Sequence, residues 1–96
     1  MPKLSHTELH DALHTLDGWS IKNEKLHREF QFADFAHAFG FMATAALGIE
    51  KMDHHPEWQN VYNRVTVDLT THDEGGISAK DITLAKLLDA VAKKLR

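Results

Sequence analysis

Hydrophobic and polar residues alternate along the chain with two periods, one typical of helices and the other typical of strands. Residues 5–16 predict a short helix, in which Ser5 is the N-cap and Glu8 is placed to close a capping box. Residues 19–32 predict two strands around a turn near residues 23–25. In the second of these strands, two sets of side chains alternate: Leu26, Arg28, Phe30 and Phe32 against His27, Glu29 and Gln31.

The segment 35–52 predicts a longer helix, which Asp34 can cap. It is apolar nearly all round, but its uncharged run, residues 38–49, is too short to span a bilayer. One layer of sheet can cover only one side of such a helix, so the other side needs a partner. We expect a second copy of the chain to provide it, in a homo-oligomer with this helix in the interface. The alternative is that the third helix covers this side. One predicted face of the long helix holds Phe35, Phe39, Met42, Ala46 and Ile49.

The chain after the long helix predicts further strand structure and a last helix. Residues 58–72 alternate, which permits one long strand or a hairpin turning at Asn63–Arg64. One predicted face of this segment carries Val61, Val65, Val67 and Leu69. After a turn at residues 73–76, the last helix begins at Ser78 or Asp81. The resulting order, α-β-β-α-β-β-α, indicates the α+β class, with an antiparallel sheet and helices packed on one face.

Composition narrows the functional classes without changing this fold. The 96 residues suffice for a single domain spanning residues 1–96. The net charge is -3 and there is no block of Lys or Arg, which disfavours nucleic-acid binding. There are no cysteines, which excludes disulfides, thiolate nucleophiles and cysteine-ligated zinc. The first residues lack an apolar signal segment, so we expect a cytoplasmic protein that is not bound to a membrane.

The chain contains eight histidines, which is the unusual feature of its composition. His6, His10 and His14 follow one another at i, i+4 and i+8, so they project from one side of the first helix. Such a stripe can bind Zn²⁺ or Ni²⁺, but a dedicated site usually adds further ligands and supporting carboxylates. We therefore interpret the stripe as a solvated boundary of that helix. His27 and His37 are single residues in amphipathic elements, and we expect structural roles for both.

The remaining histidines, His54, His55 and His72, lie at predicted ends of elements, where functional sites are usually built. Glu50 precedes the pair by one helical turn, and Asp81 opens the last helix. Glu50 lies near a helix C-terminus, where the helix dipole disfavours an anion, so its position needs another reason. Three imidazoles and a few carboxylates are the ingredients of a zinc site and of an acid–base site alike. The residues alone leave these two interpretations open.

A longer pattern separates them by resemblance. The string Glu50, three residues, His54-His55-Pro56, five residues, Tyr62, nine residues, His72, eight residues and Asp81 resembles the signature of the pterin-4a-carbinolamine dehydratases. The surrounding words HHPEWQNVYNRV and GGISAKDITLA are similar to that family too. The resemblance is dense over residues 50–85. Over residues 1–49 only the order of elements, the chain length and the first hairpin agree.

This resemblance implies a fold, an activity and an assembly. The fold is a two-layer sandwich with a four-stranded antiparallel sheet and three helices on one face, in which residues 58–72 form a hairpin. The activity is dehydration of 4a-hydroxytetrahydrobiopterin, the pterin-4a-carbinolamine, to quinonoid dihydropterin during tetrahydrobiopterin recycling. It requires no metal and no organic cofactor. The assembly is a homodimer or a homotetramer.

The resemblance also implies roles for particular residues. His54, His55 and His72 would surround the C4a–N5 edge of the pterin as general acid and base, because imidazoles titrate near neutral pH. The orienting and binding residues would be Glu50, Asp53, Trp58 and Asp81. Two alternatives remain: a zinc hydrolase that uses the same histidines as ligands, and a non-catalytic dimerisation module of a transcription factor.

Overall fold

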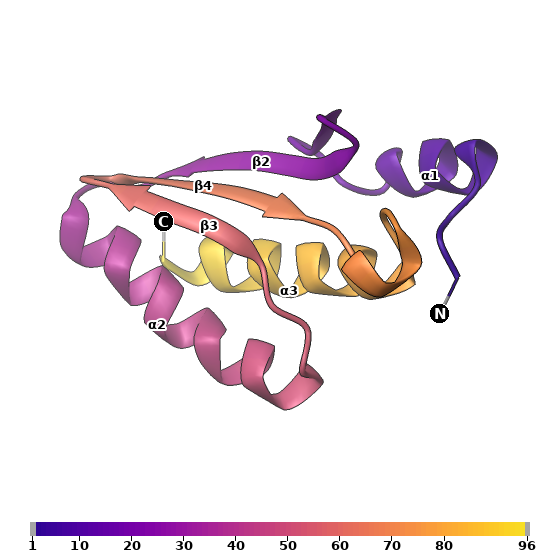
Figure 1. Ribbon diagram of the computed structural model, residues 1–96. Coiled ribbons are helices and arrows are strands. Elements are labelled where there is room, and N and C mark those ends of the chain that lie inside the picture. Colours follow the sequence, from indigo (N-terminus) through magenta and orange to yellow (C-terminus); the bar gives the residue numbers. More distant parts are fainter. Residues whose placement is uncertain (1, 96) are drawn as a thin grey trace.

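Two long helices lie under one face of a four-stranded antiparallel sheet (Figure 1). The computed structural model describes residues 2–95. Its elements are α1 (His6–Leu13), β1 (Ser20–Lys22), β2 (Lys25–Gln31), α2 (Phe35–Met52), β3 (Glu57–Val61), β4 (Arg64–Leu69), the 3₁₀ turn η1 (His72–Glu74) and α3 (Ala79–Leu95). The predicted order α-β-β-α-β-β-α and the α+β class are confirmed. The helices α2 and α3 cover the sheet, whereas the short α1 lies beyond its end.

The strand order β1-β2-β4-β3 places the second strand of each hairpin in the centre of the sheet. The first hairpin turns through Asn23 and Glu24, whose φ angles of 53° and 62° are those of a two-residue type I′ turn. The second hairpin turns between Val61 and Arg64, which pair directly. The segment after Pro56 is therefore a hairpin and not one long strand.

The second hairpin corrects the predicted position of Val61. Val61 is 58% exposed, whereas Val65 is fully buried. Because a two-residue turn separates the strands, Val61 lies opposite Arg64 and shares its outward direction. Continuous alternation would have placed Val61 with the core valines, and that expectation is wrong.

The helices begin where the sequence predicts, and α2 also ends there, but α1 ends at Leu13, three residues before its predicted end. Ser5 and Glu8 form the capping box of α1, with Ser5 Oγ accepting from the Glu8 N–H at 3.1 Å. Asp34 caps α2 by accepting from the His37 N–H at 2.8 Å, and Asp53 ends that helix in the left-handed conformation with φ of 52°. A hydrogen bond from the His37 backbone, with a second from the His37 side chain, lowers the pKa of Asp34.

The buried face of α2 differs from the predicted grouping. It consists of Ala38, Phe41, Ala45 and Ile49. Phe35 and Phe39, which we had grouped with Ile49, are exposed. The buried positions follow one another at three or four residues, so they form the narrower stripe that one sheet and α3 can cover. At Gly48 the two helices approach closely: an added Cβ there would lie 2.6 Å from Leu87 Cδ1.

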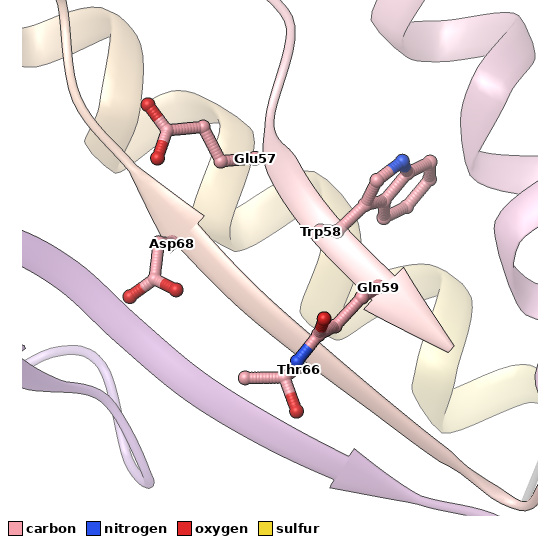
Figure 2. A pocket seen from close by; sticks show the side chains of 5 residues that line it. All are labelled: Glu57, Trp58, Gln59, Thr66 and Asp68. Carbon is pink, nitrogen blue, oxygen red and sulfur yellow. The ribbon is translucent and has the colours of Figure 1, made fainter. Parts of the chain in front are cut away.

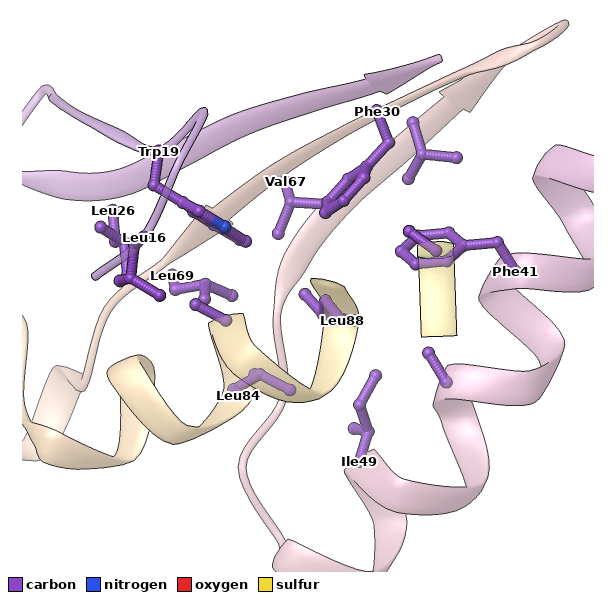
Figure 3. Packing of buried hydrophobic residues seen from close by; sticks show 14 of the residues in the cluster. Leu16, Trp19, Leu26, Phe30, Phe41, Ile49, Val67, Leu69, Leu84 and Leu88 are labelled. Carbon is purple, nitrogen blue, oxygen red and sulfur yellow. The ribbon is translucent and has the colours of Figure 1, made fainter. Parts of the chain in front are cut away.

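The core lies between the sheet and these two helices (Figure 3). The Phe30 ring lies 4.9 Å from the Phe41 ring and joins β2 to α2. Leu84 and Leu88 of α3 are fully buried in the same cluster. Arg28 faces inward as its alternation predicts, stacks 4.4 Å above Phe30 and bonds to Asp89. Within residues 2–95, none of the helices has the length and apolar character that crossing a membrane requires.

Two valines on paired strands provide a test of this core. Val67→Ala removes two buried methyl groups from the centre of the sheet, and we expect it to reduce the free energy of unfolding by about 2 kcal/mol. Val61→Ala on the exposed edge should change it by less than about 0.5 kcal/mol. Urea denaturation followed by circular dichroism measures both, and equal effects would contradict the assigned faces.

Candidate active site

A carboxylate with no exposed surface organises one end of the molecule. Asp81, in the first turn of α3, is completely buried. Its Oδ1 accepts a hydrogen bond from His54 Nε2 at 2.6 Å, and its Oδ2 accepts from Thr71 Oγ1 at 2.8 Å and from the Ser78 N–H at 2.9 Å. A buried charge is tolerated only when hydrogen-bond donors surround it, and Asp81 has three. These donors come from three separate segments of the chain.

His54 reaches Asp81 because of how α2 ends. The left-handed Asp53 stops the helix, and Pro56 keeps the next residues extended. The chain therefore turns from α2 into β3 across the start of α3. The His54 side chain is only 11% exposed in this position. One histidine of the motif, His54, therefore contacts the buried carboxylate of Asp81.

His72 contacts a different carboxylate from the one that His54 contacts. It opens η1 directly after Thr71, and its Nε2 lies 3.2 Å from Glu57 Oε2 at the start of β3. The other carboxylate oxygen of Glu57 accepts from Lys25 Nζ at 2.6 Å. The His72 side chain is 80% exposed, so water screens this pair far more than the buried one. Since Glu57 is only three residues from His54, one short segment connects the surroundings of both imidazoles.

His55 points to a different environment. It lines a pocket of about 190 Å³ together with Ala46, Ile49, Glu50, Pro56 and Trp58. The pocket lies where the end of α2 meets the start of β3, and it brings Glu50 and Trp58 next to His55. Its apolar walls and two ionisable groups suit a flat, polar-edged ligand.

Trp58 separates this pocket from a second one on the outer face of the sheet. Its ring points toward α2, as Figure 2 shows, and lies 6.3 Å from the Phe41 ring. The outer pocket, of about 280 Å³, is lined by Glu57, Trp58, Gln59, Thr66 and Asp68. Asp68 also bonds to His27 Nδ1 at 2.8 Å across the β2–β4 pair. The structural role expected for His27 is therefore a cross-strand hydrogen bond.

The predicted site residues thus have three immediate environments. His54 contacts Asp81, His55 shares a pocket with Glu50 and Trp58, and His72 contacts Glu57. Asp53 is exposed and forms the helix end.

The remaining histidines lie elsewhere. The stripe on α1 is exposed, with the His10 and His14 rings 4.6 Å apart, and His37 bonds to Asp34. Over residues 2–95 no group of three or more histidines and carboxylates is arranged to hold a metal ion.

Sequence reasoning missed four contributors to this end of the molecule: Lys25, Glu57, Thr71 and Ser78. Ser78 was noted only as a helix start, although it donates to the buried carboxylate and contacts Thr71 Oγ1 at 2.7 Å. Hydroxyl residues are common, and nothing in their spacing marks them as partners of Asp81. Glu57 stood inside the motif, but its contacts depend on strand register.

The ion pair beside His72 has a defined electrostatic effect. The hydrogen bond from the Lys25 ammonium lowers the pKa of Glu57, and the His72 imidazole adds to that effect. Correspondingly, Glu57 raises the pKa of Lys25. Glu57 is therefore ionised at neutral pH.

Comparison with known proteins agrees with the motif. The family model described as pterin 4 alpha carbinolamine dehydratase matches residues 2–91. A protein of Solibacter usitatus, provisionally named a pterin-4-alpha-carbinolamine dehydratase, is 63% identical over 90 residues, which are 94% of this chain and 95% of the relative. The matched range includes every histidine and carboxylate described above.

Solved structures resemble the whole fold. A crystal structure from Brucella melitensis, described as a transcriptional coactivator/pterin dehydratase, has a TM-score of 0.91 and 51% identity and covers 94% of this chain and 98% of its own. A pterin dehydratase-like protein described as a RuBisCO assembly factor in the α-carboxysome has a TM-score of 0.63 at 23% identity, over 77% of this chain and 86% of its own. At that identity the second likeness concerns the fold alone.

The Lys25–Glu57 pair predicts a measurable titration. Lys25→Met should raise the pKa of Glu57 toward its ordinary value, because the hydrogen bond that lowers it is lost. A lowered carboxyl pKa stabilises the fold above the pKa of the unfolded chain, and this contribution disappears as pH falls through the folded value. Carboxyl ¹³C NMR follows the titration, and Lys86→Met on α3 is the control. The same Glu57 pKa in wild type and Lys25→Met would refute the effect.

Proposed function

Because the chain belongs to the pterin 4 alpha carbinolamine dehydratase family, we propose that it converts a 4a-hydroxytetrahydropterin to quinonoid dihydropterin. The observation that carries this proposal is the buried Asp81–His54 pair beside the pocket that contains His55 and Glu50. It supplies an oriented imidazole and a second ionisable cluster within one short segment. The substrate class is a small, flat pterin, and tetrahydrobiopterin recycling is the setting in which such a carbinolamine arises.

The reaction needs two proton transfers. The C4a–O bond breaks as an imidazolium donates a proton to the leaving hydroxide, which departs as water. The N5–H bond breaks as a neutral imidazole takes its proton, and the electron pair forms the C4a=N5 double bond. Histidine suits both transfers because its proton affinity lies near neutral pH, and each positioned acid or base contributes about 10²–10⁴-fold.

Within this proposal the residues have four roles. His54, His55 and His72 are the acid–base groups. Asp81 and Glu50 orient imidazoles or hold their charged form, and Asp53 shapes the turn that carries the pair. Trp58 forms a wall of the pocket and flanks the pterin plane.

The proposed route uses neither a metal nor an organic cofactor, because imidazoles carry both protons. The zinc-hydrolase alternative would use the same side chains as ligands. Metal analysis of the purified protein and an assay in the presence of a chelator distinguish the two. Stoichiometric zinc and loss of activity on chelation would support the hydrolase and overturn the proposed route.

We also propose that α2 joins copies of the chain in a homodimer or a homotetramer. Phe35, Phe39 and Leu47 of α2 are 51%, 57% and 76% exposed, outside the buried face of the helix. They follow one another at multiples of four residues, so they form a continuous apolar stripe. The stripe fits a second copy of the same helix, since matching small and apolar residues would bury each other.

A second candidate function uses the same stripe for a different protein. The Brucella melitensis structure is described as a transcriptional coactivator as well as a pterin dehydratase. A chain that acts only as such a module would retain its oligomer and bind its partner without accelerating dehydration. The carbinolamine assay below separates this candidate from the enzyme.

The catalytic proposal predicts the effect of single substitutions. His54→Ala, His55→Ala and His72→Ala should each lower kcat by at least tenfold while the fold is retained, because each removes a proton donor or acceptor. The measurement follows decay of chemically generated carbinolamine, with a chelator present and with circular dichroism as the check of folding. His14→Ala, exposed at the C-cap of α1, is the control and should keep wild-type activity. Wild-type turnover in all three variants would refute the assignment.

The assembly proposal predicts a change of mass. Leu47→Glu places a charge in the middle of the apolar stripe, and we expect it to convert the oligomer to monomers. Light scattering coupled to size-exclusion chromatography measures the mass. Thr83→Glu, exposed on α3, introduces the same charge away from the stripe and should leave the oligomer intact. A monomeric wild-type protein, or an oligomer unaffected by Leu47→Glu, would contradict this interface.

A further inference from the structure

Two buried hydroxyls complete the surroundings of Asp81. Thr71 Oγ1 contacts Asp81 Oδ2 at 2.8 Å and Ser78 Oγ at 2.7 Å. Ser78 also gives its backbone N–H to Oδ2, and its Oγ accepts from the Lys80 N–H at 3.3 Å. Ser78 and Asp81 are fully buried and Thr71 nearly so. Each side-chain oxygen in this network therefore has a hydrogen-bond partner within the protein.

Counting protons gives the direction of each hydrogen bond in the network. A hydroxyl has one proton, and Thr71 donates its proton to Asp81 Oδ2. The contact between the two hydroxyls must therefore use the proton of Ser78, with Thr71 Oγ1 as the acceptor. The Lys80 N–H in turn donates to Ser78 Oγ. Every hydrogen bond in the network runs toward Asp81.

For an ionised Asp81, the direction of these hydrogen bonds determines which ring nitrogen of His54 carries the proton. Asp81 Oδ2 already accepts two protons from donors, and Oδ1 faces only His54 Nε2. An ionised carboxylate accepts at both oxygens, so the bond at Oδ1 requires a proton on Nε2. In the neutral imidazole, Nδ1 is then the only ring nitrogen that has a lone pair to accept a proton.

We infer that Thr71 and Ser78 are positioning residues: their donors hold Asp81 as a carboxylate aimed at His54. This carboxylate fixes the His54 tautomer and so makes Nδ1 of His54 the proton acceptor of the proposed reaction. The catalytic consequence of this inference rests on the proposed function, whereas the position of the proton on His54 is independent of that function. The proton from pterin N5 passes to Nδ1, and the proton for the leaving hydroxide comes from a second imidazole. Asp81 retains its charge throughout and balances the imidazolium that forms.

Thr71 contributes to the surroundings of both His54 and His72. Its side chain determines the state of His54 through Asp81, whereas its backbone N–H donates to the Gly76 carbonyl at 2.9 Å. Its carbonyl accepts from the Glu74 N–H at 3.0 Å and so begins the turn that carries His72. Replacing only the hydroxyl should therefore affect His54 and leave the η1 turn in place.

Substitution at Thr71 tests the inference, because Thr→Val keeps the shape and removes the hydroxyl. In wild type, ¹⁵N NMR of neutral His54 should show the proton on Nε2. In Thr71→Val we expect a mixture of tautomers and a fall in kcat of at least tenfold, with KM within about twofold of wild type, because a positioning residue changes the reactive form and not the pocket. Thr71→Ser restores the hydroxyl and should recover both readouts. Thr83→Val, on the exposed side of α3, is the matched control.

The outcomes separate this inference from the function on which it rests. A proton on Nδ1 of wild-type His54 would overturn the inference without any variant, even if Thr71→Val failed to fold. An unchanged tautomer and unchanged kcat in folded Thr71→Val would also overturn it. A tautomer that shifts in a protein without dehydratase activity would support the positioning role and refute the proposed function.

Discussion

The arrangement of the candidate site depends on the neutralisation of one buried carboxylate. Removing an ionised carboxylate from water costs several kcal/mol even after the protein relaxes, so Asp81 can remain charged only with donors in place. Those donors come from the segment after α2, from the end of β4 and from the residue before α3. Loss of His54 leaves Oδ1 without its partner, whereas loss of Thr71 Oγ1 leaves Oδ2 with a single donor. The three segments are therefore held together by the same charge.

The rest of the fold brings these segments to one end. The antiparallel sheet places the end of β4 beside the start of β3, and their pairing of Asp68 with Glu57 sets how far His72 extends past the last strand. The close approach of α2 and α3 at Gly48 fixes the distance between the two helices that carry the pair. Core packing thus determines the geometry of the candidate site.

Much of this fold could be predicted from local sequence. The caps at Ser5 and Asp34 and the stop around Asp53 rest on short-range hydrogen bonds and backbone preferences, which the sequence contains in full. Whether residues 58–72 form one long strand or a hairpin could not be obtained in the same way, because both are compatible with the alternation around Val61. Only the turn distinguishes them, and its residues carry no glycine signal.

The site residues show the same difference between local and long-range information. The histidines and Asp81 were recognised because their identities and spacings form a long motif. Thr71, Ser78 and Glu57 were not, because their contacts exist only once separate elements have come together. Asp81 lies in the first turn of α3, where it accepts from the Ser78 N–H through one oxygen and contacts His54 through the other. Its role as an orienting group stays a prediction.

Burial gives His54 and His72 different relations to their carboxylates. His54 is 11% exposed and its partner Asp81 is fully buried, so water screens their interaction little. The hydrogen bonds from Thr71 and Ser78 hold the Asp81 carboxylate in place. His72 is 80% exposed, and its partner Glu57 is shared with Lys25, so water and a competing cation both weaken that attachment. In the proposed dehydration, the buried His54 would keep a defined tautomer, and the exposed His72 would exchange protons with solvent between turnovers. Burial and exposure would thus give two chemically identical side chains different tasks.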